Sequence, residues 1–141
     1  MKYRNIFITG STGVVGKPLL RKIVDQGHNV FALSRSQNND HFFSDLGVKK
    51  IEGDLFREAI YHELSDYNID SIFHIAGVNK MCSKNPEGMF KANIEGTKEM
   101  LQLGNRLKIK KFIYTSSAVT LGEEIGTVGN ELSDHRGYFL S

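Results

Sequence analysis

A glycine-rich turn near the start of the chain, TGSTGVVG at residues 9–16, restricts the fold more than any other stretch of the sequence. It follows NIFITG (residues 5–10), a short apolar and β-branched run that is typical of a buried strand. It leads into VVGKPLLRKIVDQG (residues 14–27), where apolar residues recur at helical spacing and a final glycine predicts the helix end. This order of strand, turn and helix brings the unpaired N–H groups of the helix start to one place, where they favour an anion.

Each of the three glycines in this turn has a predicted task. Gly10 permits a tight turn, Gly13 lets the backbone approach a pyrophosphate, and Gly16 lets the helix pack closely on the strand. The spacing is G-x-x-G-x-x-G rather than G-x-G-x-x-G, and a merely structural turn is the alternative. The strand before the turn and the helix after it favour a dinucleotide site. The residues expected to contact the cofactor here are Gly10, Thr12, Gly13, Val14, Val15 and Gly16.

The rest of the chain continues the alternation of strands and helices. Further strands are predicted at residues 29–34, 49–54, 71–77 and 110–117, and further helices at 57–68 and 85–107, with a loop or short helix at 36–47. Such alternation indicates parallel strands joined by right-handed helical crossovers. We therefore predict one α/β domain, residues 1–141, with a doubly wound parallel (Rossmann) sheet of five strands in the order 3-2-1-4-5. The core candidates include Phe42, Phe43, Phe90 and Phe112.

The charge balance and the single cysteine exclude several classes of partner and site. Lys and Arg number 18 against 16 Asp and Glu, a net charge of +2, so electrostatics give no case for nucleic acid or for an anionic membrane surface. Cys82 alone rules out an internal disulfide and fits a reducing compartment, and the His and Cys residues show no metal-ligand spacing. The apolar run at the N-terminus is too short for a secretion signal or a membrane span. We expect a cytoplasmic protein without a metal.

The end of the second strand predicts the form of the dinucleotide. An acidic residue at this position takes the ribose 2′-hydroxyl of NAD, whereas an arginine accommodates the 2′-phosphate of NADP. Residues 32–36 read ALSRS, without Asp or Glu, and Arg35 can offer a planar fork of donors to a phosphate. A solvated surface arginine is the alternative. We predict NADP as the cofactor, with NAD as the second choice.

Four further motifs follow in order: GDL at residues 53–55, HIAG at 74–77, NIEGT at 93–97 and FIYTSSAVTLG at 112–122. Together with the glycine turn, they resemble the signatures of the extended short-chain dehydrogenase/reductases, also called NAD-dependent epimerase/dehydratases. The local sequence is nearest to the dihydroflavonol-reductase-like branch, which also tends to carry an arginine after the second strand. The resemblance covers the whole chain.

The resemblance implies roles for individual residues beyond the glycine turn. Asp54 would accept a hydrogen bond from the exocyclic amine of the adenine, with Leu55 beside it. Ala76 and Gly77 would lie next to the cofactor. His74, at the start of the same stretch, is expected to be structural rather than a base.

The chemistry that the resemblance implies is hydride transfer between the nicotinamide and a carbon that bears oxygen. Ser117 would hydrogen-bond that oxygen, and Tyr138 would give it a proton or take one away. The family's Y-x-x-x-K motif would place a lysine directly after Ser141, where the printed sequence ends. We therefore expect the N-terminal portion of a reductase or epimerase for a small molecule with a hydroxyl or carbonyl group, such as a sugar derivative or a flavonoid-like alcohol.

Three expectations follow from this incomplete match. Without the family's later strands and its substrate-binding part, the sheet would keep an exposed edge, through which the chain could form a homodimer or associate. The alternative to an enzyme is a non-catalytic module that binds or senses NADPH, or an inactive fragment. Lys108 stands where relatives often have a glycine after a helix, and it would cost on the order of 1 kcal/mol if its backbone is left-handed.

Overall fold

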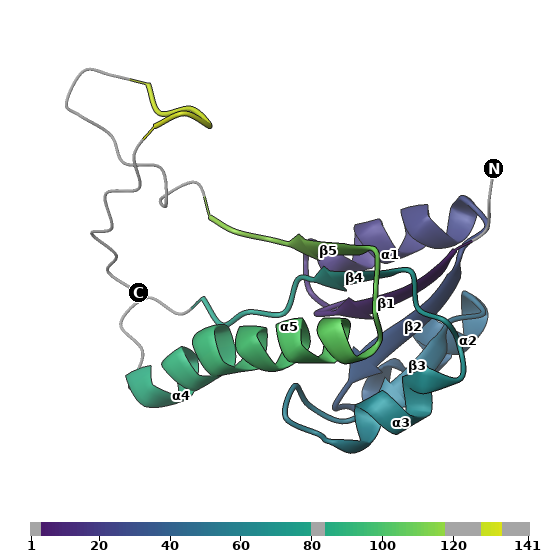
Figure 1. The fold of residues 1–141 in the computed structure, drawn as a ribbon. Coiled ribbons are helices and arrows are strands. Elements are labelled where there is room, and N and C mark those ends of the chain that lie inside the picture. The colour runs from purple at the N-terminus through teal and green to yellow at the C-terminus, as the bar shows by residue number, and fades with distance from the viewer. Residues whose placement is uncertain (1–3, 80–83, 118–127, 134–141) are drawn as a thin grey trace.

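The computed structural model describes residues 4–79, 84–117 and 128–133. Five parallel strands form one sheet in the order β3-β2-β1-β4-β5, which confirms the predicted topology (Figure 1). The strands are β1 Asn5–Thr9, β2 Asn29–Ser34, β3 Lys49–Glu52, β4 Ser71–His74 and β5 Lys111–Tyr114. Strand β1 lies in the middle, where Ile6 is in register with Val30 of β2 and with Ser71 of β4.

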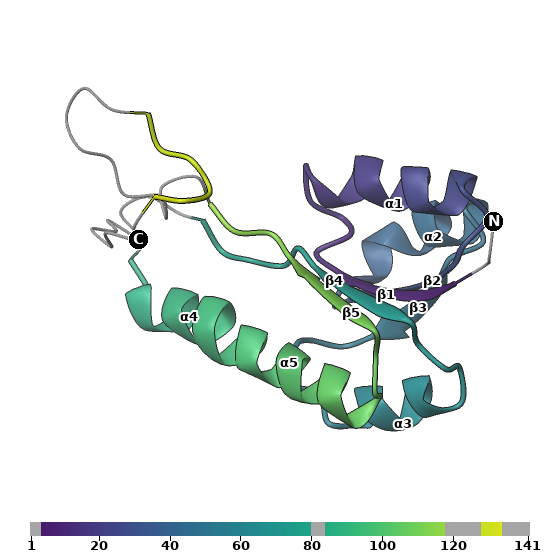
Figure 2. The ribbon, with the colours of Figure 1, turned by 45° about the horizontal axis from the view of Figure 1, so that its top comes forward.

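Helices cover both faces of the sheet, as the doubly wound arrangement requires (Figure 2). On one face lie α1 Gly16–Asp25 and α2 Asp40–Asp45, the latter preceded by a 3-10 turn, η1 Gln37–Asn39. The other face is covered by α3 Ala59–Ser65 and by a long helical segment. This segment consists of α4 Pro86–Phe90, the π turn η2 Lys91–Glu95 and α5 Gly96–Arg106.

Two apolar layers join the helices to the sheet. Successive side chains of a strand point to opposite faces, so Phe7 enters one layer and its neighbours Ile6 and Ile8 enter the other. One layer packs Phe7, Phe31, Ile51 and Ile72 of the sheet against Ile60, Leu64, Met100 and Leu103 of α3 and α5. The other packs Ile6, Ile8, Val30 and Ala32 against Leu20, Ile23 and Phe43 of α1 and α2. Burial on both faces explains why these strands appear in the sequence as continuous apolar runs.

The helix boundaries follow the start and stop signals of the sequence. Helix α1 is followed by Gly27, whose φ of 81° is left-handed and whose amide donates to the carbonyl of Val24 at 2.8 Å. Pro86 is the first residue of α4, and the side chain of Asn85 accepts from an amide of the first turn at 2.8 Å. After α5, Lys108 has a φ of 53°. This is the left-handed conformation, which a lysine adopts only at a cost in free energy.

The structure corrects three details of the predicted elements. β3, β4 and β5 end at Glu52, His74 and Tyr114, earlier than predicted; after β4, for example, the amide of Ala76 donates to the hydroxyl of Thr9 instead of a strand carbonyl. The predicted helix at 85–107 contains the π turn η2. The assignment of Phe90 to the core is wrong, because its side chain is 61% exposed on α4.

The outer strands of the described sheet are β3 and β5. Tyr114 of β5 is 50% exposed, so part of this edge presents an aromatic side chain to solvent. A homodimer or association through the edge stays a prediction. None of the helices in the described ranges is long and apolar enough to cross a membrane.

Candidate dinucleotide-binding site

The candidate site lies at the carboxyl ends of β1 and β4, where the strand order reverses. From β1 the chain continues to β2 and β3 on one side, and it returns to β4 and β5 on the other. Ligands of open parallel sheets bind in the crevice at such a reversal. The loops that follow the two strands are in contact, because the amide of Ile75 donates to the carbonyl of Thr9 at 3.3 Å. A Cβ on Gly10 would lie 2.5 Å from the amide nitrogen of Ala76.

The glycine turn has the tight geometry that its sequence indicates. Gly10 has a φ of 70°, and its carbonyl accepts from the amide of Gly13 at 3.1 Å. The same carbonyl oxygen lies so close to Gly16 that a Cβ there would stand 2.0 Å from it. The local tasks predicted for Gly10 and Gly16, a left-handed turn and close packing, therefore agree with the backbone. The approach of a pyrophosphate to Gly13 stays a prediction.

The start of α1 carries backbone N–H donors that the described part of the turn does not use. Val14 and Val15 are 94% and 56% exposed, and within the described ranges their amides have no hydrogen-bond acceptor. A Cβ on Gly13 would meet only the carbonyl oxygen of Gly10, at 3.3 Å, so the outer side of Gly13 is open. Exposed amides at the positive end of a helix fit the diphosphate of a dinucleotide.

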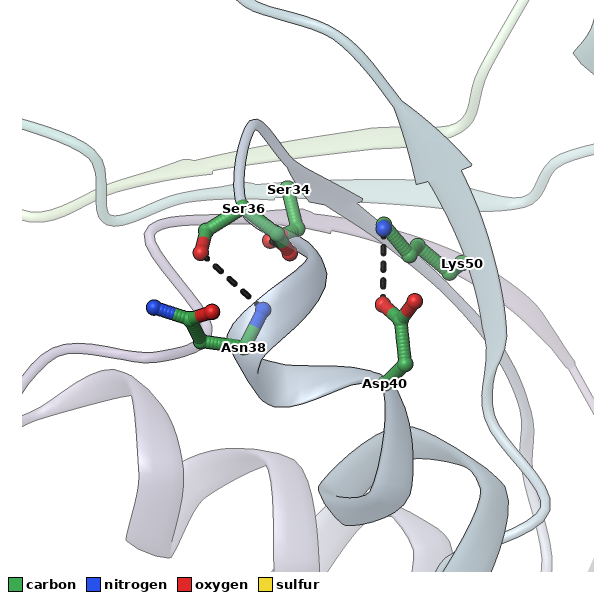
Figure 3. A network of polar contacts seen from close by, with 5 residues as sticks. All are labelled: Ser34, Ser36, Asn38, Asp40 and Lys50. Atoms are coloured by element: carbon green, nitrogen blue, oxygen red, sulfur yellow. Dashed lines mark hydrogen bonds and ion pairs between the residues drawn. The ribbon is translucent and has the colours of Figure 1, made fainter.

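The turn after β2 is ordered by short-range polar contacts (Figure 3). Ser36 caps the 3-10 turn, since its hydroxyl accepts from the amide of Asn38 at 3.1 Å. The hydroxyl of Ser34 donates to the carbonyl of Ser36 at 3.3 Å. Arg35 lies between these two serines and its side chain is exposed. This turn therefore presents an arginine from an ordered backbone at the carboxyl end of β2.

The first acidic residue after β2 is Asp40, and it is engaged elsewhere. Its carboxylate lies 2.7 Å from the ammonium of Lys50 on β3, as Figure 3 shows. The segment between Ser34 and Asp40 contains no Asp or Glu. The turn after β2 therefore carries an exposed cation, and the nearest following carboxylate is already paired.

The GDL segment after β3 is tied to the long helix. Asp54 closes a turn by accepting from the amide of Phe56 at 2.9 Å. The side chain of Leu55 packs on Gly96, where a Cβ would stand 2.5 Å from its Cδ1. The glycine of the NIEGT motif thus makes room for the leucine of the GDL motif. Contact of Asp54 or Leu55 with adenine stays a prediction.

His74 lies at the centre of a buried polar network. Its Nδ1 is 2.8 Å from the hydroxyl of Thr9, and its Nε2 is 3.0 Å from the hydroxyl of Thr97 on α5. The ring is fully buried, with Tyr114 stacked at 5.7 Å between ring centroids. Burial lowers the pKa of His74 from 6.5 to about 4. A neutral, fully engaged imidazole agrees with the expected structural role.

The proposed catalytic residues are placed only in part. Ser117 is exposed and follows β5, at the same edge of the sheet as the glycine turn. The amide of Thr115 still donates to the carbonyl of His74 at 3.1 Å, so the chain continues beside β4 for one residue past the strand. Tyr138 lies outside the described residues.

Sequence reasoning missed the side chains that connect these motifs. Thr9 opens the glycine motif, while Asn93 and Thr97 are fixed letters of N-x-x-G-T. Nothing in the motifs shows that Thr9 and Thr97 meet at His74, or that Asn93 bonds to Val78. The available signal was the presence of hydroxyl and amide side chains at motif positions beside buried strands. Over the described ranges, His, Cys, Asp and Glu side chains form no group that could hold a metal.

The parallel sheet with strand order 3-2-1-4-5, its two helical layers and the glycine turn at the strand reversal define a Rossmann-type α/β domain. A sequence model of the NAD dependent epimerase/dehydratase family matches residues 6–138. The chain belongs to this family.

Two curated relatives and one solved structure illustrate the likeness. The chain is 29% identical over 116 residues to a Synechocystis protein named "Putative dihydroflavonol 4-reductase", a match that covers 82% of this chain and 33% of the relative. It is 27% identical over 127 residues to the decarboxylating sterol-4-alpha-carboxylate 3-dehydrogenase of Dictyostelium discoideum, with 86% and 38% covered. The UDP-glucose-4-epimerase of Stenotrophomonas maltophila, solved with bound NAD and formylated UDP-arabinopyranose, superposes with a TM-score of 0.81 at 20% identity, covering 94% of this chain and 43% of that one.

The chain thus spans about a third of the length of these two curated relatives. The likeness to the epimerase supports the fold. The family whose model matches is described as NAD dependent.

Proposed function

We propose that this chain is the dinucleotide-binding part of an oxidoreductase or epimerase that prefers NADP. The observation that carries the proposal is the turn at residues 9–16, where amides without a described acceptor at the start of α1 lie beside a glycine with open space on one side. The backbone of this turn would hold the diphosphate. Its contributing residues would be Gly10, Thr12, Gly13, Val14, Val15 and Gly16.

The adenosine end would be held by the loops after β2 and β3. Arg35 would pair with a ribose 2′-phosphate through its guanidinium, supported by the ordered turn on either side of it. Asp54 would accept from the adenine amine through the oxygen that its turn leaves unused, and Leu55 would contact the ring. The preference for NADP over NAD rests on Arg35 together with the pairing of Asp40 with Lys50.

The nicotinamide end would lie along the loop after β4, next to Ala76 and Gly77. The cofactor supplies hydride chemistry when it is bound. Ser117 would donate a hydrogen bond to the reacting oxygen of the substrate, and Tyr138 would exchange a proton with that oxygen. The substrate would be a small molecule with a hydroxyl or carbonyl group, because the relatives with which the chain aligns are named as a reductase and a dehydrogenase. The family match favours this enzymatic parent over a non-catalytic sensing module.

A direct titration tests the proposal. Reduced nicotinamide absorbs and emits at wavelengths where protein side chains do not, so the fluorescence of NADPH itself reports binding. We expect saturable binding of NADPH, weaker binding of NADH, and an increase of the melting temperature with NADPH concentration. Failure of both cofactors to bind at millimolar concentration, to a chain shown to be folded by circular dichroism, would overturn the proposal.

A further inference from the structure

We propose that His74 is a positioning residue that sets the loop at residues 75–79 for the nicotinamide end of the dinucleotide. It does so through a series of hydrogen bonds that all donate in the same direction. The series runs from the loop after β4 to β1, back to His74 on β4, and on to the long helix. This inference rests on the proposed function, because it assigns a task within the same site.

The direction of the hydrogen bonds follows from the groups at the two ends of the chain. The amide of Ala76 can only donate, and it donates to Thr9 Oγ1 at 3.2 Å, so the hydroxyl hydrogen of Thr9 is left for Nδ1 of His74. The carbonyl of Asn93 can only accept, and it takes the hydroxyl hydrogen of Thr97 at 2.7 Å. Thr97 Oγ1 must therefore accept from Nε2–H of His74. Both ends select the same neutral tautomer, with the proton on Nε2.

The far end of this chain returns to the loop after β4. The side-chain oxygen of Asn93 accepts from the amide of Val78 at 2.7 Å, and its Nδ2 donates to the carbonyl of Val78 at 2.9 Å. Asn93 is the middle residue of the π turn η2, and α5 begins directly after this turn. The loop is consequently held at Ala76 through Thr9 and at Val78 through Asn93, and His74 joins these two anchor points.

The network reaches one half of the candidate site only. Its members come from β1, β4 and the long helix, and they hold the loop that lies against Gly10. The turn that carries Arg35 follows β2, and its own contacts are among Ser34, Ser36 and Asn38. Disruption of the network should therefore affect a ligand that extends along residues 75–79 more than one that ends at the phosphate groups of the adenosine.

The test compares NADPH with 2′,5′-ADP, which keeps the adenosine and the 2′-phosphate but lacks the nicotinamide. His74→Leu removes both nitrogens, whereas His74→Gln keeps one acceptor and one donor. Thr97→Val removes the hydroxyl, and Thr97→Ser retains it. Binding is measured by isothermal titration calorimetry, and circular dichroism verifies folding. We expect His74→Leu and Thr97→Val to lower the affinity for NADPH about tenfold or more, as loss of a buried hydrogen bond implies. The affinity for 2′,5′-ADP should fall less than about twofold. His74→Gln and Thr97→Ser should recover most of the affinity.

Three outcomes would overturn the inference. An equal loss of affinity for both ligands would mean that the network only supports the fold. Unchanged NADPH affinity in a folded His74→Leu or Thr97→Val variant would mean that the loop needs no such support. Absence of binding of NADPH, NADH and 2′,5′-ADP to the wild-type chain would remove the proposed function and this inference with it. If the wild type prefers NADH, the same comparison is made with NADH and ADP. If His74→Leu does not fold, the Thr97 pair decides the question.

Discussion

The carbonyl oxygen of Gly10 lies against Gly16 so closely that a methyl group on Gly16 would stand 2.0 Å from it. The oxygen belongs to the backbone and the position of a Cβ is fixed by the backbone, so no rotation of a side chain relieves the clash. We expect Gly16→Ala to lower the free energy of unfolding by about 3 kcal/mol, at the upper end for an overpacked site. Urea denaturation followed by circular dichroism measures this loss.

The matched control for Gly16 is Gly47, which follows α2. It has a φ of 65° and no heavy atom within 4 Å of a built Cβ. Gly47→Ala should cost only the left-handed backbone, about 1 kcal/mol. Equal losses in the two variants would show that the contact between Gly10 and Gly16 does not decide the stability of the turn.

Gly13 should separate binding from stability. A Cβ there meets only the carbonyl oxygen of Gly10, at 3.3 Å, so the fold can accept it with a small adjustment, and we expect Gly13→Ala to change stability by less than about 1 kcal/mol. The added methyl group would lie on the open side of the turn and keep a diphosphate from the amides. NADPH affinity, measured by its fluorescence, should fall about tenfold or more. Undiminished affinity would exclude the turn as the diphosphate site.

Arg35 should control the choice between the two cofactors. Arg35→Ser removes a charged donor to the 2′-phosphate, which is worth about 1.5–3 kcal/mol, so NADPH should bind about tenfold to a hundredfold more weakly while NADH is unaffected. The control is Arg106→Ser, at the end of α5, where the arginine stacks over Tyr61 at 4.0 Å from the ring centroid. Parallel calorimetric titrations with NADPH and NADH give the ratio of the two affinities. A loss of NADPH affinity in Arg106→Ser of the same size would point to a general effect of charge.

The buried imidazole of His74 should make stability depend on pH. Its pKa is about 4 in the folded chain and 6.5 when unfolded, so between these values the unfolded state binds more protons and stability rises with pH. This contribution is complete above pH 6.5 and is lost as the pH falls toward 4, at no more than about 1.4 kcal/mol per pH unit.

Urea unfolding of wild type and His74→Gln at several pH values isolates the pH-dependent contribution of His74 to stability. The described neighbours of the ring are the hydroxyls of Thr9 and Thr97 and the rings of Phe112 and Tyr114. The glutamine variant lacks a titrating group at this position, so its stability should fall less steeply over the same interval. Parallel curves for the two proteins would contradict a depressed pKa for His74.

Lys108 offers a gain in stability. Its φ of 53° strains a side chain with a Cβ, so Lys108→Gly should raise the free energy of unfolding by about 1 kcal/mol. Asn68, with a φ of 47°, is the control, because asparagine tolerates this conformation and Asn68→Gly should gain less. Thermal melts rank the two variants. A destabilised Lys108→Gly would show that the lysine contributes contacts that outweigh its strain.

The strands and the hand of their connections were predictable because their physical causes are local, and the strand order then follows from the doubly wound arrangement. Apolar runs at residues 5–10 and 29–34 indicate strands buried on both faces, and the alternation with helices restricts their connections to right-handed crossovers. The glycine turn was likewise predictable, since the left-handed conformation of Gly10 and the close packing of Gly16 are properties that only glycine supplies.

The network around His74 was not predictable in the same way. Thr9 and His74 are 65 positions apart, and His74 and Thr97 are 23 apart, so their contacts exist only once β1, β4 and α5 are packed together. The π turn at Lys91–Glu95 has no sequence signal comparable to a proline or a glycine. Phe90 was misassigned because an aromatic side chain in a helix is more often buried than exposed.

The contact of Leu55 with Gly96 means that two motifs usually treated as separate signatures share one space. A methyl group at position 96 would displace the Cδ1 of Leu55, so the leucine would have to change its rotamer or be replaced by a smaller residue. Among homologous chains, these two positions should therefore vary in concert, and a design that grafts one of the loops onto a different Rossmann scaffold has to carry the other along.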